Sequence, residues 1–365
     1  MTNDENIHPV SSGIRNPESG IRIVGIIGEG KMGTSIFYHL LEFPFSLRWI
    51  GSTEADTDHL QKQVEKKLRR SVKCGIMNQE EHDRRIQHVV ISRELKCLSD
   101  CDLVIEAIPE EEELKRHLFK ALDEITPPTC ILASNSSSIN PSKLFIPGSR
   151  DSYIIGIHYF YPVPLRETVE LILTEKTSPE THEKAESFLI QSGKQILKLN
   201  ERNSFILNRL FLDIQNEAYR IIEQGKATES QLDNLVKEQL FPIGIFDFMD
   251  CVGIDTMLTA IRNYTAEYPH QDYFEGLITR LQQYVMAGKL GQKSGEGFYR
   301  YQDNPAGNSG SNIPLSAESA REIAEHLRFT YLNAAKRFTM QSRCTIDEMN
   351  TAIKEYFGLE KGPFE

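Results

Sequence analysis

A histidine and a glutamate in neighbouring apolar runs are the two side chains of this sequence best suited to move a proton. His158 follows the run 153–157, Glu170 lies within the run 168–172, and two prolines separate the runs. A chain that turns back at these prolines would lay the runs side by side and bring Glu170 next to His158. A carboxylate on one imidazole nitrogen fixes the tautomer and makes the other nitrogen more basic. The pair predicts a general base that removes the proton of a hydroxyl group while a hydride leaves the carbon that carries this hydroxyl. The alternative is a structural histidine.

A second site is predicted where an apolar run, 21–27, leads into Gly-x-Gly-x-x-Gly and then into a helical pattern over 32–41. Strand, glycine turn and helix in this order bind dinucleotides, because glycines allow the tight turn and the close approach of a pyrophosphate. The helix start adds free N–H groups and a positive dipole end. The alternative is a glycine turn without a ligand. The expected cofactor-binding residues here are Gly28, Gly30, Lys31, Met32 and Gly33.

The acid that usually selects NAD is missing from its expected position. The run 47–50 predicts the second strand, and in NAD-binding proteins a carboxylate at the end of this strand binds the ribose 2′-hydroxyl. Here Gly51 follows, and Glu54 and Asp56 come slightly later. No arginine follows immediately to bind a 2′-phosphate. We therefore predict NAD, with Glu54 reaching back as one route and NADP as the alternative.

Two further apolar runs end in polar residues. The run 102–108 is followed by Pro109 and Glu110, and the run 129–133 is followed by five small polar residues, 134–138. Ligands bind at the carboxyl ends of strands in parallel sheets. The segment 134–138 is therefore expected to line a binding site, with a role in capping the next turn as the alternative.

A helical pattern over 58–75 carries a basic run that has two interpretations. One is a solvated helix face, and the other is a positive surface for a phosphate-bearing substrate such as coenzyme A. Gly75 is expected to end the helix. The basic residues are Lys62, Lys66, Lys67, Arg69, Arg70 and Lys73.

Composition limits the class of protein. The chain has 365 residues, enough for two or three domains, and a net charge of −11, which argues against a nucleic-acid partner. No apolar run is long enough to span a membrane, and residues 1–20 are polar and lack the apolar core of a signal peptide. The six cysteines are scattered, so we expect reduced thiols, no metal site and a cytoplasmic protein.

These segments together resemble the L-3-hydroxyacyl-CoA dehydrogenase family. The resemblance covers roughly residues 21 to 302, in the family's order, through GIIGEGKMG, VIEAIPE, ASNSSS, GIHYFYPVP, VELI, FILNRL and GKLGQKSGEGFYRY. It implies an α/β Rossmann-type N-terminal domain followed by an all-α C-terminal domain. It also implies interconversion of a 3-hydroxyacyl-CoA and a 3-ketoacyl-CoA with NAD(P), in fatty-acid or related acyl-CoA metabolism.

The resemblance also implies roles for single residues. His158 matches the catalytic base, Glu170 its orienting partner, and Ser137 and Asn208 the residues that hold the substrate. Glu110, Lys115 and Lys293 match cofactor-contacting positions, and Ser137 is placed in both groups. Two alternatives stay open: a dehydrogenase of a free hydroxy acid, as in gulonate- or carnitine-oxidising relatives, and a non-catalytic protein on the same fold.

Two further departures from the family pattern concern the site. Tyr161 stands where the family usually has asparagine, and we expect the larger side chain to narrow the site or move the nicotinamide contact. Asn203 and Ser204 replace a Pro-Gly pair before the helix expected over 205–224, which is expected to loosen the start of that helix.

The last part of the chain resembles an earlier part. Three segments recur at an offset of 117 or 118 residues: 216–218 at 333–335, 228–233 at 345–350, and 244–246 at 362–364. A steady offset suggests a partial second all-α copy, with an unrelated amphipathic tail as the alternative. Since single-copy relatives dimerise through this domain, the copy could replace a partner subunit, giving a monomer, or a homodimer through another surface. The expected divisions are a tail over 1–20, the cofactor domain over 21–200, the helical domain over 201–301, a linker over 302–314 and the partial repeat over 315–365.

Overall fold

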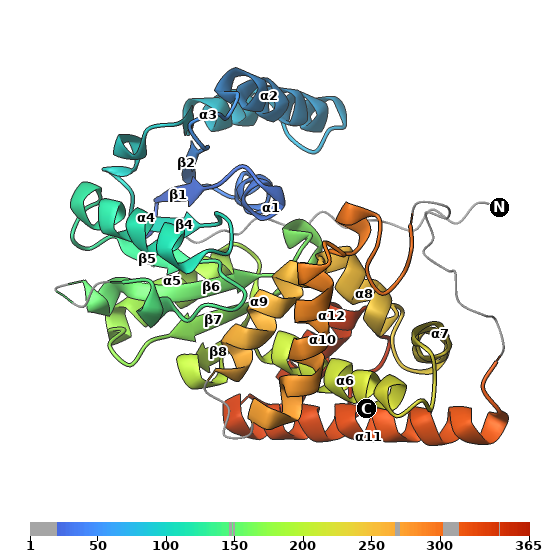
Figure 1. Cartoon of the computed structure of the whole chain (residues 1–365). Helices are drawn as coiled ribbons and strands as arrows, with labels where there is room; N and C mark the ends of the chain where they lie inside the picture. Colours follow the sequence, from blue (N-terminus) through green and yellow to red (C-terminus); the bar gives the residue numbers. More distant parts are fainter. Residues whose placement is uncertain (1–19, 146–147, 149, 267–270, 302–313, 343) are drawn as a thin grey trace.

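The chain folds into a sheet covered by helices, followed by a region made of helices (Figure 1). The computed structural model describes residues 20–145, 148, 150–266, 271–301, 314–342 and 344–365. All of the expected tail except Gly20, and all of the expected linker except Pro314, lie outside the described residues. No helix in the described ranges is long and apolar enough to cross a bilayer.

The sheet has eight strands in the order β3-β2-β1-β4-β5-β6-β7-β8. All neighbouring strands are parallel except β6 and β7, which are antiparallel. This is the doubly wound arrangement expected of a Rossmann-type domain. The strands are β1 (Ile23–Ile27), β2 (Ser46–Ile50), β3 (Val89–Ser92), β4 (Leu103–Glu106), β5 (Ile131–Ser134), β6 (Ile154–Tyr159), β7 (Thr168–Leu173) and β8 (Gln195–Asn200).

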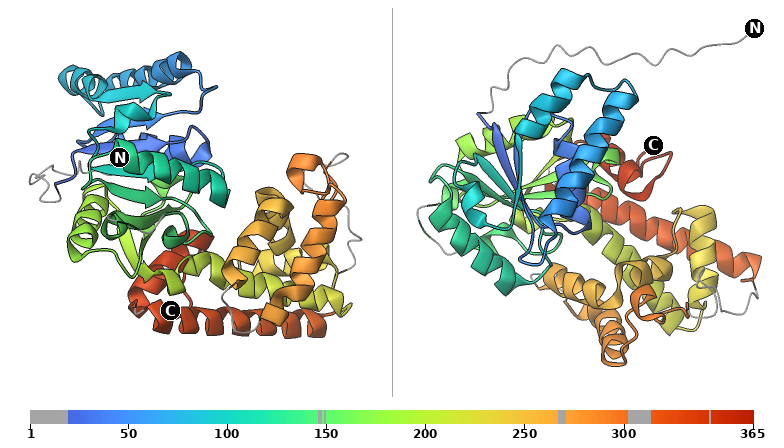
Figure 2. Two further views of the ribbon diagram at one scale, coloured as in Figure 1. Left: turned by 60° about the vertical axis from the view of Figure 1, so that its left-hand side comes forward. Right: turned by 90° about the horizontal axis from the view of Figure 1, so that it is seen from above.

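Helices cover both faces of the sheet because successive strand residues point to opposite sides (Figure 2). In β4, Ile105 packs into a cluster with residues of α1, α2 and α5, whereas Val104 packs into a second cluster with residues of α4. Both faces are therefore apolar. The helices of this part are α1 (Lys31–Leu40), α2 (Thr57–Lys73), α3 (Gln79–Gln87), α4 (Glu112–Ile125) and α5 (Pro179–Gln191).

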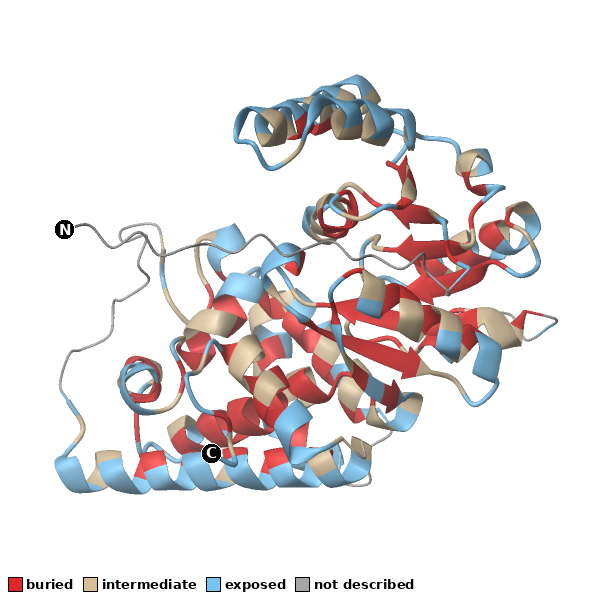
Figure 3. Ribbon diagram, turned by 180° about the vertical axis from the view of Figure 1, so that it is seen from behind, coloured by how far each residue is buried: buried red, intermediate tan, exposed pale blue. Residues whose placement is uncertain are grey.

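The helical region is built around α6, most of whose residues are buried. α11 lies along α6, and α12 packs against both α6 and β7. The outer face of α11 is exposed and its inner face is buried (Figure 3). The helices are α6 (Ile206–Glu223), α7 (Glu229–Gln239), α8 (Ile245–Val252), α9 (Ile254–Thr265), α10 (Glu275–Met286), α11 (Ala317–Ser342) and α12 (Ile346–Phe357).

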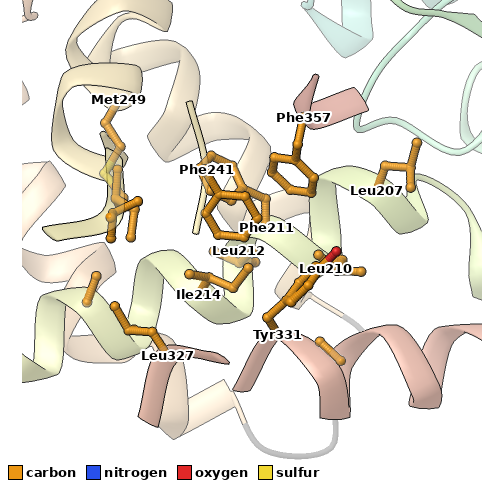
Figure 4. Close-up of a cluster of buried hydrophobic side chains, with 14 of the residues drawn as sticks. Leu207, Leu210, Phe211, Leu212, Ile214, Phe241, Met249, Leu327, Tyr331 and Phe357 are labelled. Carbon is orange, nitrogen blue, oxygen red and sulfur yellow. The ribbon is translucent and has the colours of Figure 1, made fainter. Parts of the chain in front are cut away.

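One hydrophobic core joins α11 and α12 to the rest of this region. Figure 4 shows Leu327 and Tyr331 of α11 and Phe357 of α12 beside side chains of α6. The rings of Phe357 and Phe211 meet edge to face with centroids 5.1 Å apart. α11 and α12 are thus packed into the core of the helical region.

Local structure recurs where the sequence repeats. Thr228 is the N-cap residue of α7 and Thr345 is the N-cap residue of α12, and each forms a capping box. The Asp233 side chain accepts a hydrogen bond from the backbone N–H of Phe246 at 3.0 Å. At the matching positions, Asn350 accepts one from Phe364 at 3.1 Å. The same helix start and the same side-chain-supported turn therefore occur twice.

Candidate active site

The glycine turn between β1 and α1 has the geometry that a dinucleotide requires. Gly28 has a positive φ of 116°, and a Cβ on Gly33 would lie 2.1 Å from the Gly28 carbonyl oxygen, so helix and turn meet without space for a side chain. A Cβ on Gly30 would meet nothing within 4 Å. Gly30 also begins α1 without a side-chain cap, which leaves N–H groups for an anion. Trp49 of β2 donates to the Gly28 carbonyl at 2.9 Å and fixes the turn.

A cleft of about 1200 Å³ runs from this turn to the ends of β4, β5 and β6. It brings together most of the residues that the sequence predicted. Gly33, Glu170, Asn208 and Lys293 are not among the lining residues. The predicted residues that line the cleft are Gly28, Gly30, Lys31, Met32, Glu110, Lys115, Ser137 and His158.

The histidine and the glutamate meet as expected from the turn at the prolines. β6 and β7 are antiparallel, and His158 lies directly opposite Glu170 in their register. His158 Nδ1 is 2.8 Å from Glu170 Oε2, and both side chains are buried. The carboxylate favours the proton on Nδ1, which leaves Nε2 as the basic atom. Phe160 and Phe205 meet the imidazole edge to face, with centroids 4.6 and 5.7 Å away. The expected pairing is confirmed, and its catalytic role stays a prediction.

Glu110 organises the loop that carries Ser137. One oxygen of its carboxylate, Oε1, accepts hydrogen bonds from the Ser136 and Ser138 hydroxyls at 2.6 and 2.8 Å, and from the backbone N–H of Ser137 at 3.1 Å. Burial raises the pKa of Glu110, but the charge of Lys115 and the serine hydroxyls outweigh it and the pKa is lowered. Glu110 is therefore a charged support for this loop at the cleft wall.

Lys115 is a buried cation held by carboxylates on both sides. Its Nζ is 2.5 Å from Glu106 Oε1 and 3.3 Å from Glu110 Oε2. Glu106 also accepts the Ser134 hydroxyl at 2.7 Å. Glu106 was not predicted as a site residue, although an acid in a buried strand was a usable signal.

Asn208 of α6 reaches the serine loop from the helical region. Its Nδ2 lies 2.9 Å from the Tyr264 hydroxyl and 3.4 Å from the Ser137 carbonyl oxygen, to which Tyr264 donates at 2.7 Å. Lys293 does not line the cleft. It pairs with Asp255 at 2.5 Å, and Asp255 lines the cleft.

The two residues before α6 that replace Pro-Gly are both hydrogen-bonded. Ser204 donates to Asn140 Oδ1 at 2.7 Å, and Asn203 donates to the Gln341 carbonyl at 2.6 Å. Both side chains that replace Pro-Gly are hydrogen-bonded, and the expected loosening stays a prediction. Tyr161 lines the cleft with 56% of its surface exposed.

Glu29, within the glycine turn, is an acid beside the end of β2 that was not predicted as a site residue. Its carboxylate accepts hydrogen bonds from the backbone N–H of Ser52 at 3.0 Å and from the Ser52 hydroxyl at 2.5 Å. Burial raises the pKa of Glu29, but these bonds prevail and lower it. Glu29, Gly51 and Ser52 line the cleft, whereas Glu54 is exposed and is not among the lining residues. A glutamate inside the glycine motif was the available signal.

The basic run on α2 does not line the cleft. Its residues are exposed or half-buried, and Lys67 pairs with Glu42 at 3.0 Å. Both interpretations of this helix therefore stay open.

Comparisons with known proteins show which family this sequence resembles. The model of the 3-hydroxyacyl-CoA dehydrogenase NAD-binding domain matches residues 23–203, and the model of the C-terminal domain of the same family matches residues 205–301. The 3-hydroxybutyryl-CoA dehydrogenase of Mycobacterium tuberculosis is 34% identical over 287 residues, which cover 77% of this chain and 99% of that protein.

Two solved structures show how far the likeness extends. The crystal structure of Mycobacterium tuberculosis FadB2 has a TM-score of 0.65 at 33% identity and covers 77% of this chain and 99% of its own. That of 3-hydroxybutyryl-CoA dehydrogenase from Escherichia coli, at 19% identity, shows the same fold with a TM-score of 0.74 over 94% of this chain and 90% of its own. The matches to both domain models and to these relatives establish that the chain belongs to the 3-hydroxyacyl-CoA dehydrogenase family.

Proposed function

We propose that the protein interconverts 3-hydroxyacyl-CoA and 3-ketoacyl-CoA thioesters in acyl-CoA metabolism. The observation that carries the proposal is the His158–Glu170 pair, whose histidine lines the same cleft as the glycine turn. When bound, a nicotinamide cofactor supplies the hydride acceptor or donor. The turn from Gly28 to Met32, with the start of α1, would hold its phosphates.

The side chains of the protein supply acid–base chemistry and orientation. His158 Nε2 takes the proton of the 3-hydroxyl group, and Glu170 stabilises the imidazolium that results. Ser137 and Asn208 hold the hydroxyacyl group in place. In the reducing direction the imidazolium returns the proton to the oxygen at C3.

A substrate comparison tests this proposal. NADH formation is followed with 3-hydroxybutyryl-CoA and with free 3-hydroxybutyrate as the control. We expect turnover of the thioester alone. Turnover of the free acid alone would support a hydroxy-acid dehydrogenase instead, and binding of NADH without turnover of any thioester would support a non-catalytic protein.

We further propose that the cofactor is NAD, because Glu29 places a negative charge beside the end of β2. A carboxylate there can accept a hydrogen bond from a ribose hydroxyl, as the missing strand-end acid would. The same charge would repel a 2′-phosphate. Glu29 thereby replaces Glu54 as the residue we expect to select the cofactor.

Cofactor selection can be measured without catalysis. Trp49, the single tryptophan of the chain, donates to Gly28, so its fluorescence reports a dinucleotide bound at the turn. We expect NADH to bind about tenfold or more tightly than NADPH, and Glu29→Gln to narrow that ratio. Glu54→Gln, which removes an exposed acid just beyond the same strand, is the matched control and should leave the ratio unchanged. Equal binding of both cofactors by the wild type would contradict the proposal.

We also propose that residues 315–365 are a partial repeat of the helical domain and that they cover a surface of α6 within one chain. The offset of the recurring segments, the two capping boxes and the packing of α11 along α6 support this proposal. The expected state is a monomer, or a homodimer formed through a surface other than α11.

A further inference from the structure

One hydrogen bond to a predicted site residue comes from α12, far from that residue in the sequence. Tyr356 of α12 donates its hydroxyl hydrogen to Asn208 Oδ1 at 2.8 Å. The two residues are 148 positions apart in the sequence. The family models end at residue 301, so this contact comes from outside the part of the chain that they match.

A directional chain of hydrogen bonds runs from this tyrosine to the serine loop. Tyr356 donates to the Asn208 carbonyl oxygen, the Asn208 amide donates to the Tyr264 hydroxyl, and Tyr264 donates to the Ser137 carbonyl. Burial raises the pKa of Tyr356, and the nearby charge of Glu170 raises it further, so its hydroxyl keeps the hydrogen that it donates. In this chain of hydrogen bonds Asn208 Oδ1 accepts from Tyr356 and Asn208 Nδ2 donates to Tyr264. The N–H end of Asn208 is therefore directed toward Tyr264 and Ser137.

The ring of Tyr356 extends the aromatic packing around the catalytic histidine. It meets Phe160 edge to face with centroids 5.4 Å apart, and Phe160 meets His158 at 4.6 Å. α12 is thus in contact with both sides of the proposed substrate site: the amide of Asn208 and the ring that packs on His158.

The residue before Tyr356 anchors α12 to the hairpin that carries the catalytic pair. Glu355 Oε2 accepts a hydrogen bond from the backbone N–H of Thr168 at 2.7 Å, and the Glu355 carbonyl accepts one from the Arg166 guanidinium. Thr168 is the first residue of β7, the strand of Glu170. These contacts hold α12 in register with the site.

We propose that Tyr356 is a positioning residue, which fixes the Asn208 amide and, through Tyr264, the Ser137 carbonyl of the loop that holds the hydroxyacyl group. The inference rests on the proposed function. It assigns to residues 315–365 a part in substrate binding, in addition to packing on α6. The site of this chain is then incomplete without α12.

Tyr356→Phe is the test variant, because it keeps the ring contacts and removes only the hydroxyl. We expect kcat/KM for 3-hydroxybutyryl-CoA to fall about tenfold, as for an amide left without its partner. Calorimetry should show a fall of similar size, about tenfold, in affinity for butyryl-CoA, with no change for free coenzyme A. NADH binding, read from Trp49, should not change. Wild-type values in both thioester measurements would overturn the inference.

The same substitution in an Asn208→Ala background tests whether Tyr356 acts through the asparagine. If it does, Tyr356→Phe adds no further loss there. Losses that multiply in full would overturn the inference. Tyr331→Phe is the matched control, because Tyr331 is buried on α11 of the same segment and its hydroxyl has no hydrogen-bond partner among the described residues. A loss in this variant as large as in Tyr356→Phe would also overturn it.

The calorimetric measurement separates this inference from the proposed function. A wild type that turns over no thioester would remove the proposed function, while a Tyr356-dependent affinity for butyryl-CoA would still support the contact. A wild type that turns over thioesters, with no effect of Tyr356→Phe, would remove only the inference.

Discussion

Two residues that are expected to contact the substrate, His158 and Ser137, are each held by a carboxylate that is not expected to contact it. Glu170 holds His158, and Glu110 supports the backbone of Ser137. Glu170 is buried and Glu110 is half-buried, and either carboxylate would be costly to leave without its partner. Substitution of Glu170 should therefore change the rate more than it changes cofactor binding.

Glu170→Gln is the sharpest change of this kind. The amide fills the same space but cannot stabilise an imidazolium on His158. We expect kcat to fall on the order of 10²-fold or more, with a changed pH profile. NADH binding, measured through Trp49, is the control and should stay as in the wild type. A kcat within about twofold of the wild type would exclude the proposed role of Glu170.

The candidate site was predictable where local signals exist. His158 and Glu170 are brought together by one turn between adjacent strands, so prolines and apolar runs were sufficient. The contacts of Asn208 were not predictable, because Tyr264 and Tyr356 reach it from distant helices and only tertiary packing brings them there. The role of Glu29 was missed because a fingerprint rule directs attention to the strand end rather than to the turn.

Strands with two buried faces were easier to predict from the sequence than elements with few buried residues. Strands such as β4 are buried on both faces and read as continuous apolar runs, which made the Rossmann-type sheet predictable. α3 has no buried residue, and the edge strand β3 is only partly buried. Without an apolar face, neither gives a periodic pattern, and both were absent from the prediction.

The packing of α1 against the sheet predicts a pH dependence of stability. His39 is buried, and its Nε2 lies 2.9 Å from the Ser192 carbonyl oxygen. Burial, together with the charge of Lys194, lowers the pKa of His39 from 6.5 to about 4. Between these values the unfolded chain binds a proton that the folded chain does not, so the stability contributed by His39 falls as the pH drops through this window.

A matched pair of variants measures that dependence. We expect the free energy of unfolding to lose about 3 kcal/mol through His39 between neutral pH and about pH 4. The wild type should therefore lose more than His39→Gln over this range in urea titrations followed by Trp49 fluorescence. His88→Gln, at an exposed site, should behave as the wild type. Equal pH dependence of the wild type and His39→Gln would contradict the assignment.

For the molecule as a whole, α11 is expected to be part of one cooperative core. Leu327 is fully buried against the helical region. Leu327→Ala should lower the free energy of unfolding by about 2–5 kcal/mol. Circular dichroism and Trp49 fluorescence should report the same transition, because the helices and the sheet unfold together. Met340→Ala, on the exposed face of α11, is the control.

Separate transitions would contradict this view. If Leu327→Ala shifted the circular dichroism but left the Trp49 transition in place, α11 would be an independent tail.

The covering of α6 by α11 leads to an expectation for the assembly. We expect light scattering to give the mass of one chain, 41.7 kDa, or of a dimer whose interface does not lie on α11. A dimer that Phe329→Asp leaves intact would place the interface on a surface other than α11. A dimer that this substitution dissociates would contradict the proposed role of residues 315–365, because Phe329 lies on α11 with most of its surface exposed.

The proposed role of His158 as the general base is tested by NADH formation from 3-hydroxybutyryl-CoA, followed with the wild type and with His158→Ala. The wild type should turn the thioester over, and the variant should lose a factor on the order of 10²–10⁴ in kcat. NADH binding through Trp49 should be the same for both. Equal rates for the two proteins, with both folded and both binding NADH, would contradict the account.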